Sequence, residues 1–136
     1  MNITAKNLVD FAVNAREKSY CPYSNFSVGA ALLTKEGKIY TGANIESVSF
    51  TPTICAERVA FFSAVHNGEK EFKAIAIVGA KSGQEINAFC SPCGVCRQVM
   101  QEFCDKDFEI YLYDGKDIKT FTLGEIFPEA FNNNIL

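Results

Sequence analysis

Apolar and polar residues recur along this chain with two different periods, which together predict helices packed on a β-sheet. Residues 4–18 carry apolar side chains at the spacing of one helical face, and Thr4 is placed to cap the helix at its start. The residues predicted on the buried face of this helix are Leu8, Phe11, Ala12 and Ala15.

Short runs of apolar and β-branched residues predict the strands. They cover residues 28–34, 38–42, 74–79, 108–113 and 118–122. Glu36-Gly37 and Asp114-Gly115 supply turns between neighbouring runs, so the first two segments read as a hairpin and the last two as the final pair of strands.

Two further helices are predicted to begin beside cysteines. One runs from about Cys55 to His66, with Gly68 as a stop signal. The other opens at Pro92-Cys93, where a proline loses no hydrogen bond because the first N–H groups of a helix lack an intrahelical partner. Four of its residues are expected to point inward: Val95, Val99, Met100 and Phe103.

A short helical C-terminus starts near Leu123. The order of the elements predicts one sheet with helices on its faces. The length fits a single domain over residues 1–136.

Composition narrows the function mainly by exclusion. The net charge is −3 with no block of basic residues, so a nucleic-acid partner is not expected. The longest clean apolar run, residues 74–78, is too short to span a bilayer, and the N-terminus lacks the layout of a signal peptide, so a membrane partner is not expected either. Six cysteines without such a signal indicate metal ligands or free thiols and a cytoplasmic protein.

Three cysteines and a glutamate lie at the two helix starts. Cys93 and Cys96 have a spacing that lets one helical turn present two sulfurs to one ion, and Cys55 would arrive from the other helix. Three protein ligands leave the fourth tetrahedral position of a zinc ion open, as in hydrolytic sites. Glu57, two residues from a ligand, is placed to handle a proton on bound water, and zinc deaminases are an established example of this combination.

The charge of such a site needs compensation. Zn²⁺ with three thiolates carries a net charge of −1, which makes the ion a poor Lewis acid. The positive ends of both helices would offset this charge, and Arg58 could donate hydrogen bonds to the sulfurs from outside the ligand set.

The remaining cysteines leave an alternative open. Cys90, Cys93 and Cys96 are evenly spaced, so Cys90 could close a structural four-cysteine shell, although it precedes Pro92 and the helical turn. Cys21 and Cys104 are expected to be buried small residues. His66, near a helix end, has no ligand spacing.

Several ordered blocks of the sequence resemble the cytidine deaminases, specifically the small homotetrameric type that binds zinc through three cysteines. The blocks are residues 20–31, Asn44-Ile45-Glu46, Cys55-Ala56-Glu57-Arg58, residues 91–99, Phe127-Pro128 and Phe131. The resemblance implies a three-layer α/β/α fold with a five-stranded mixed sheet, and four identical subunits. It implies hydrolysis of cytidine and deoxycytidine to uridine and deoxyuridine with release of ammonia, as in pyrimidine salvage, with Glu57 shuttling the protons.

The same resemblance implies residues that bind the nucleoside. Asn44 and Glu46 would hold the ribose 3′-hydroxyl, because an amide and a carboxylate supply one donor and one acceptor. Phe26 would pack against the pyrimidine.

The other implied contacts involve the backbone and a second subunit. The N–H of Ala56 would bind the base O2, and the carbonyl of Ser91 would bind the amino group. Phe131 would reach a neighbouring subunit's site. Phe50 stands where relatives often carry a tyrosine at the subunit junction, so a hydroxyl contact is not expected there.

Three competing functions remain at this point. A deaminase resembling blasticidin-S deaminase would share the zinc blocks, although Asn44-Ile45-Glu46 and Arg58 favour a nucleoside substrate. A deaminase that edits nucleic acid is disfavoured because no basic or aromatic channel for a strand is visible. A non-catalytic module with four cysteines on zinc predicts that Cys90→Ser fails to fold.

Overall fold

The computed structural model describes residues 2–136 and consists of one mixed sheet between two layers of helices. The five strands lie in the order β2-β1-β3-β4-β5. Only the β3–β4 pair is parallel. The strands are β1 (Phe26–Thr34), β2 (Ile39–Ala43), β3 (Phe72–Lys81), β4 (Glu109–Tyr113) and β5 (Ile118–Thr122). The helices are α1 (Ala5–Ala15), α2 (Ala56–His66), α3 (Gly94–Phe103) and α4 (Leu123–Ile126), with 3₁₀ turns at Arg16–Lys18 and Asn133–Ile135.

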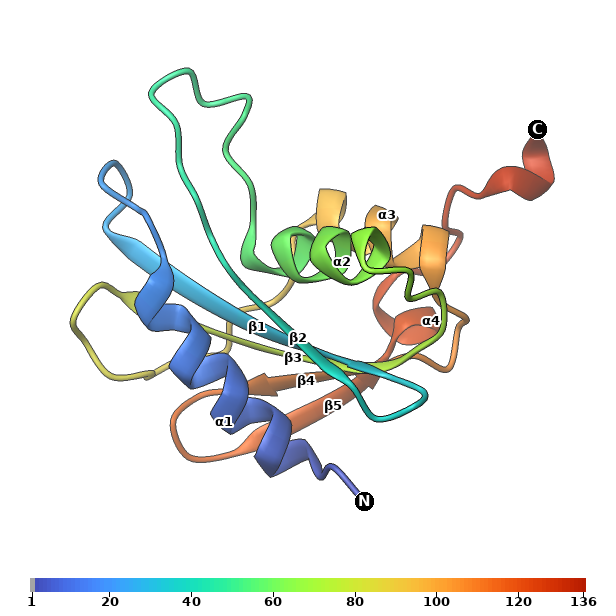
Figure 1. Cartoon of the computed structure of the whole chain (residues 1–136), viewed down its shortest axis with the longest axis horizontal. Helices are drawn as coiled ribbons and strands as arrows, with labels where there is room; N and C mark the ends of the chain where they lie inside the picture. The colour runs from blue at the N-terminus through green and yellow to red at the C-terminus, as the bar shows by residue number, and fades with distance from the viewer. Residues whose placement is uncertain (1) are drawn as a thin grey trace.

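The helices divide between the two faces of the sheet. Figure 1 shows α1 alone on one face and α2, α3 and α4 together on the other. Strand β1 is buried on both sides, because Ala31 and Leu33 pack in the cluster with α1 while Ala30 and Leu32 pack in the cluster with α2 and α3. This explains why the strand reads as a continuous apolar run rather than an alternating one. The three-layer α/β/α fold with a five-stranded mixed sheet is confirmed.

Helix α1 begins as predicted, after Thr4. The Thr4 hydroxyl accepts a hydrogen bond from the Asn7 N–H, and the Asn7 side chain accepts one from the Thr4 N–H, so the two residues form a capping box. The predicted inward position of Phe11 is wrong, because its side chain is 45% exposed and Val9 is buried instead. The buried stripe is centred between Leu8 and Ala12, which leaves Phe11 on its flank.

Helix α3 shows a similar shift. Met100 is buried, and Val99 and Phe103 pack at the edge of the core as predicted. Val95 is 57% exposed, and the neighbouring Cys96 takes the inner position one turn before Met100. The reason is the start of the helix: Cys93 is its N-cap, and the next inward position falls on Cys96.

Strand β3 is longer than the predicted 74–79 because it pairs with β1 from Phe26 to Thr34.

No helix in the described part, residues 2–136, is long and apolar enough to cross a membrane.

The start of α2 is held against β2 at a glycine. A Cβ on Gly42 would lie 2.4 Å from the Ala56 carbonyl oxygen and 2.6 Å from the Ala60 nitrogen. Backbone atoms cannot turn aside as a flexible side chain can, so Gly42 sets how closely α2 approaches the sheet.

We therefore expect Gly42→Ala to lower the free energy of unfolding by about 1–3 kcal/mol, the usual cost of overpacking. Denaturant titration of the zinc-loaded protein measures this effect. Gly94→Ala is the matched control, because a Cβ at Gly94 meets no atom within 4 Å. Equal unfolding midpoints for the two variants would show that the contact between β2 and α2 does not set the stability.

Candidate active site

Three cysteine sulfurs come together where α2 and α3 begin. Cys55 is the N-cap of α2, Cys93 is the N-cap of α3, and Cys96 lies one turn further along α3. Their sulfurs all lie within 4.8 Å of one another, and those of Cys55 and Cys93 are 3.8 Å apart. Within residues 2–136, no other group of three Cys, His, Asp or Glu side chains is gathered this closely.

These distances fit one zinc ion. A tetrahedral ion with Zn–S bonds of about 2.3 Å holds its sulfurs about 3.8 Å apart. The soft thiolate donors also favour zinc over the hard cations that prefer oxygen ligands. The chain therefore presents the three-cysteine metal site that its sequence predicts.

The local backbone explains how the site forms. Cys55 and Cys93 have extended backbone angles at their caps, and neither side chain forms a capping hydrogen bond with the backbone of its helix. Both thiol groups are therefore available to a shared metal ion. The unpaired N–H groups of two helix starts place partial positive charge beside the sulfurs and stabilise the thiolate form.

The thiols also interact with one another. A hydrogen bond from Cys96 lowers the pKa of Cys55 to about 5 against the opposing effect of burial, with further bonds from Arg58 and Cys93. The pKa of Cys96 is raised, because its thiol donates to Cys55 and is buried. The ligand form of each cysteine is the thiolate, so a bound dication would displace the thiol protons.

Glu57 lies in the first turn of α2 between Cys55 and Arg58, and its side chain is buried. Burial raises the pKa of its carboxyl to about 7, and the negative charge of Cys55 adds to the increase, whereas a backbone hydrogen bond opposes it. A carboxyl group that titrates near neutral pH is suited to both accepting and returning a proton.

Arg58 contacts the cluster from outside. Its Nη2 donates to the Cys55 sulfur at 3.4 Å, which is the hydrogen bond expected from the sequence. Its Nε is buried and has no hydrogen-bond partner among the described residues. The guanidinium therefore supplies positive charge to a group of thiolates.

We expect Arg58→Gln to weaken zinc binding about 10–100-fold, the usual effect of removing a partner of a metal ligand. Competition against a chelator of known affinity measures the change. Lys70→Gln, which removes one positive charge from an exposed site, is the control and should leave zinc affinity unchanged. Equal zinc affinity in Arg58→Gln and the wild type would contradict the role given to Arg58.

Cys90 does not belong to the sulfur group. It packs over β3, because a Cβ on Gly79 would lie 2.9 Å from the Cys90 sulfur and 2.9 Å from the Phe26 ring. Burial raises the pKa of the Cys90 thiol to about 11. Burial also raises the pKa of Cys104, which ends α3. The structure thus offers three sulfurs to an ion, and the fourth is directed to packing.

Cys21 follows the sequence expectation only in part, whereas His66 lies outside the sulfur group, as expected. Cys21 is half-buried, and its sulfur hydrogen-bonds with the Ser82 hydroxyl at 3.1 Å. His66 is exposed at the last position of α2.

Asn44 and Phe26 are joined through the backbone of β1. The Asn44 amide donates to the Phe26 carbonyl at 2.8 Å and accepts from the Val28 N–H at 2.9 Å. Asn44 is buried, whereas the Phe26 side chain is 36% exposed at the start of the strand. The Asn44 side chain therefore holds the backbone at the start of β1, where Phe26 lies.

Glu46 is held by a loop that sequence reasoning did not connect to it. Its Oε1 accepts from the N–H groups of Tyr23 at 3.0 Å and Ser24 at 3.1 Å, and its Oε2 accepts from the Ser24 hydroxyl. The hydroxyl of Ser24 is the leading cause that holds the pKa of Glu46 below its usual range. A serine one residue before an Asn-Phe pair carries no sequence signal for this contact.

The two backbone groups expected to bind the base flank the cysteines. Ala56 is buried at the first position of α2, where its N–H has no partner within the helix. Ser91 is exposed on the segment before Pro92 and Cys93. Phe131 is separate: it is 59% exposed on the segment after α4, which leaves the body of the fold in Figure 1, and its carbonyl accepts from the Gln98 side chain.

Two further features were not predicted. Arg97 donates to the carbonyls of Pro92 at 2.8 Å and Ile126 at 2.5 Å, and so ties the residue before Cys93 to the end of α4.

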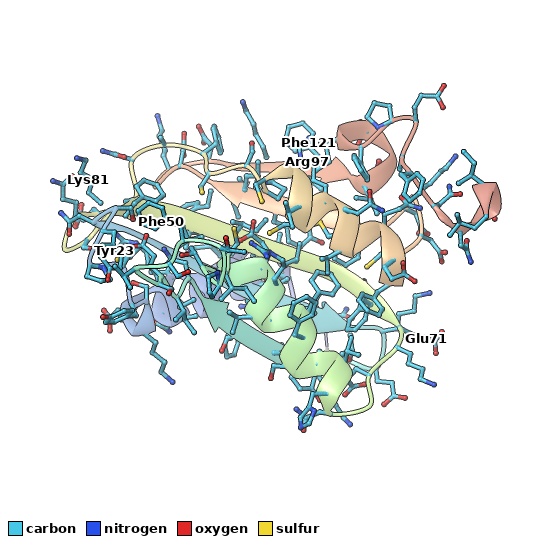
Figure 2. The ribbon with its side chains drawn as sticks, turned by 90° about the horizontal axis from the view of Figure 1, so that it is seen from above. Tyr23, Phe50, Glu71, Lys81, Arg97 and Phe121 are labelled. Carbon is cyan, nitrogen blue, oxygen red and sulfur yellow. The ribbon has the colours of Figure 1, made fainter. Side chains whose placement is uncertain are left out.

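Tyr23 and Phe50 lie side by side in Figure 2, with ring centroids 6.2 Å apart in an edge-to-face arrangement. Phe50 is 71% exposed and has a positive φ of 58°.

A hollow of about 700 Å³ lies beside α1, and none of Cys55, Cys93 and Cys96 lines it. Its lining comes from α1, the segment just after α1, the start of β1, the loop after β3 and the turn between β4 and β5. In this single chain Cys93 is exposed, Cys55 is half-buried and Cys96 is buried, so the sulfur cluster extends from the core to the surface.

A mixed sheet with a cluster of three thiols and a buried carboxyl at two helix starts defines the class of zinc-binding deaminases. The family model described as the cytidine and deoxycytidylate deaminase zinc-binding region matches residues 3–112. The chain belongs to this family.

Individual relatives agree with this assignment. The cytidine deaminase of Sporosarcina psychrophila is 46% identical over 132 residues, which covers 96% of this chain and 93% of that protein. The crystal structure of cytidine deaminase from Burkholderia pseudomallei has a TM-score of 0.86 and 44% identity, and the match covers 95% of this chain and all of that one. Blasticidin-S deaminase of Bacillus cereus is 36% identical over 110 residues, or 79% of this chain and 78% of that protein.

Proposed function

We propose that this chain catalyses the zinc-dependent hydrolysis of cytidine and 2′-deoxycytidine to uridine and 2′-deoxyuridine, with release of ammonia. The observation that carries the proposal is the group of three sulfurs within 4.8 Å of one another, close enough to share one zinc ion, beside a buried Glu57. The reaction would serve pyrimidine salvage in the cytoplasm.

Cys55, Cys93 and Cys96 would hold the ion, which when bound supplies a Lewis acid that makes water nucleophilic near neutral pH. Glu57 takes a proton from the attacking water and delivers it to N3 of the pyrimidine. It then transfers the second water proton to the departing amine, so that water and cytidine give uridine and ammonia. Shuttling of this kind by a placed carboxyl contributes roughly 10²–10⁴-fold to the rate.

The nucleoside would lie between the helix starts and the start of β1. The Ala56 N–H donates to the base O2, and the Ser91 carbonyl accepts from the amino group. The Phe26 ring packs on the pyrimidine.

The sugar is bound by Asn44 and Glu46. Asn44 uses one N–H and one lone pair of its amide on the backbone of β1. It keeps one N–H for the 3′-hydroxyl.

The chain would assemble as a homotetramer in which Phe131 reaches the site of a neighbouring subunit. Phe131 is 59% exposed on a segment that leaves the body of the fold, and Ile135 and Leu136 beyond it are also exposed. A neighbouring subunit would cover these side chains together with the exposed sulfur of Cys93. At the junction, Phe50 packs on Tyr23 through its ring.

Blasticidin S is the second candidate substrate, because a blasticidin-S deaminase is similar over most of this chain. The loss of cytidine absorbance, followed with and without a zinc chelator, tests the main proposal. We expect turnover of cytidine that stops with the chelator and returns with zinc, and faster turnover of cytidine than of blasticidin S. Faster turnover of blasticidin S than of cytidine would show that the antibiotic is the preferred substrate. Turnover that is unchanged by the chelator would overturn the zinc mechanism.

A further inference from the structure

We propose that Ser24 is a positioning residue that joins the sugar-binding and base-binding ends of the nucleoside site by fixing Glu46 relative to Phe26. This inference rests on the proposed function. It assigns a role to a side chain that belongs neither to the metal site nor to the residues expected to contact the substrate.

The Ser24 hydroxyl lies in the middle of a short chain of hydrogen bonds. A carboxylate only accepts hydrogen bonds, so the hydroxyl proton of Ser24 points to the Oε2 of Glu46. The lone pairs of the same hydroxyl are then free to accept the Phe26 N–H, whose nitrogen is 3.1 Å away. The backbone of Phe26 and the carboxylate of Glu46, which lie 20 positions apart in the sequence, thus share one hydroxyl group.

Phe26 is held on its other side by Asn44. The N–H of Phe26 bonds to Ser24, and its carbonyl accepts from the Asn44 amide at 2.8 Å. The ring rests against β3, where its Cε2 occupies the space that a Cβ on Gly79 would need. The backbone of Phe26 also pairs with Lys81 of β3, so loss of the Ser24 bond removes one of several attachments that orient the base-stacking ring.

The same contacts limit what Glu46 can bind. A carboxylate offers about four lone-pair sites. Three are filled within the chain: two on Oε1 by the N–H groups of Tyr23 and Ser24, and one on Oε2 by the Ser24 hydroxyl. One site on Oε2 remains, so the arrangement selects a ligand that presents a single hydroxyl donor there, with the spare N–H of Asn44 available to donate to the same hydroxyl.

The effect should appear in binding rather than in folding. The bonds between Ser24 and Glu46 lie at the surface of the chain, where solvent competes with them and their net contribution to stability is small. Without the hydroxyl of Ser24, Oε2 gains a second open site and Glu46 loses one of its three restraints, so its remaining acceptor is no longer aimed at the sugar.

The test compares Ser24→Ala with Ser24→Thr, which keeps the hydroxyl group. Kinetics are measured on cytidine and on 3′-deoxycytidine. For Ser24→Ala we expect the KM for cytidine to rise about tenfold, as for loss of a hydrogen bond to a charged group, with kcat changed less than about threefold. The preference of the wild type for cytidine over 3′-deoxycytidine should shrink toward one in Ser24→Ala and be retained in Ser24→Thr.

A merely structural role predicts a different pattern. If Ser24→Ala raises KM for both substrates by the same factor, or leaves the preference for the 3′-hydroxyl intact, the inference is wrong. The thermal midpoint of each variant shows whether it is folded, and a folded Ser24→Thr that behaves like Ser24→Ala also overturns it.

Calorimetric binding of uridine and 3′-deoxyuridine to the zinc-loaded proteins provides the second measurement. The wild type could fail to turn over cytidine and still bind uridine more tightly than 3′-deoxyuridine, with this preference lost in Ser24→Ala. That result would contradict the proposed reaction but support the role of Ser24. Absence of uridine binding removes both.

Discussion

Glu57→Gln is expected to lose about 10²–10⁴-fold in turnover of cytidine while keeping its zinc and its fold. Glutamine has nearly the same shape as glutamate but cannot accept a proton and return it. The Glu57 side chain is 4% exposed, so water has little access to take over the transfer. The replacement is neutral, and it removes an ionisable group whose charged form is disfavoured by burial, so we expect no loss of stability from it.

Three measurements separate the catalytic role of Glu57 from a structural one. They are kcat on cytidine, zinc content per chain and the thermal midpoint. Glu36→Gln, in the exposed turn between β1 and β2, is the matched control and should behave like the wild type. A Glu57→Gln protein that keeps zinc and more than about a tenth of the wild-type turnover would remove Glu57 from the proton transfers.

The parts of the fold that the sequence predicts well are those governed by local chemistry. Thr4 and Asn7 form their capping box within four residues of chain, and Gly37 takes the positive φ that the hairpin turn needs. The cysteine cluster was predictable for a similar reason, because Cys55 is placed by the start of α2, and Cys93 and Cys96 are both placed by the start of α3.

The errors come from packing between elements distant in sequence. Periodicity alone does not decide which side of a helical stripe faces the sheet, so Phe11 and Val95 were placed inward and are exposed. The full length of β3 depends on its pairing with β1, which ends at Thr34, 38 positions before β3 begins at Phe72.

The contacts of Glu46 show a limit of another kind. Ser24 reaches Glu46 because Asn25, with a φ of 55°, turns the chain between Ser24 and Phe26. Asparagine tolerates this conformation better than most residues, but its presence does not say which distant side chain the turn will meet. The sequence predicts the separate residues of the nucleoside site through resemblance, whereas the bonds that join them require coordinates.

Cys93→Ser is expected to lose bound zinc and, with it, more than about 10³-fold of the turnover, because the ion supplies the nucleophile. A serine hydroxyl is a harder donor than a thiolate and stays protonated at neutral pH, so it does not replace the third sulfur. The site would keep only two cysteine ligands, Cys55 and Cys96. Zinc content by atomic absorption and kcat on cytidine measure both losses.

Cys90→Ser is the matched variant, because it makes the same atomic change three residues earlier on the same segment. Cys90 lies outside the sulfur group and packs over Gly79, so this variant should retain one zinc per chain and turnover within about threefold of the wild type. A structural zinc module with four cysteines predicts the reverse, with loss of zinc and of the folded state in Cys90→Ser. Equal loss of zinc in the two variants would therefore show that Cys90 is a fourth ligand, and would leave no open position for the reacting water.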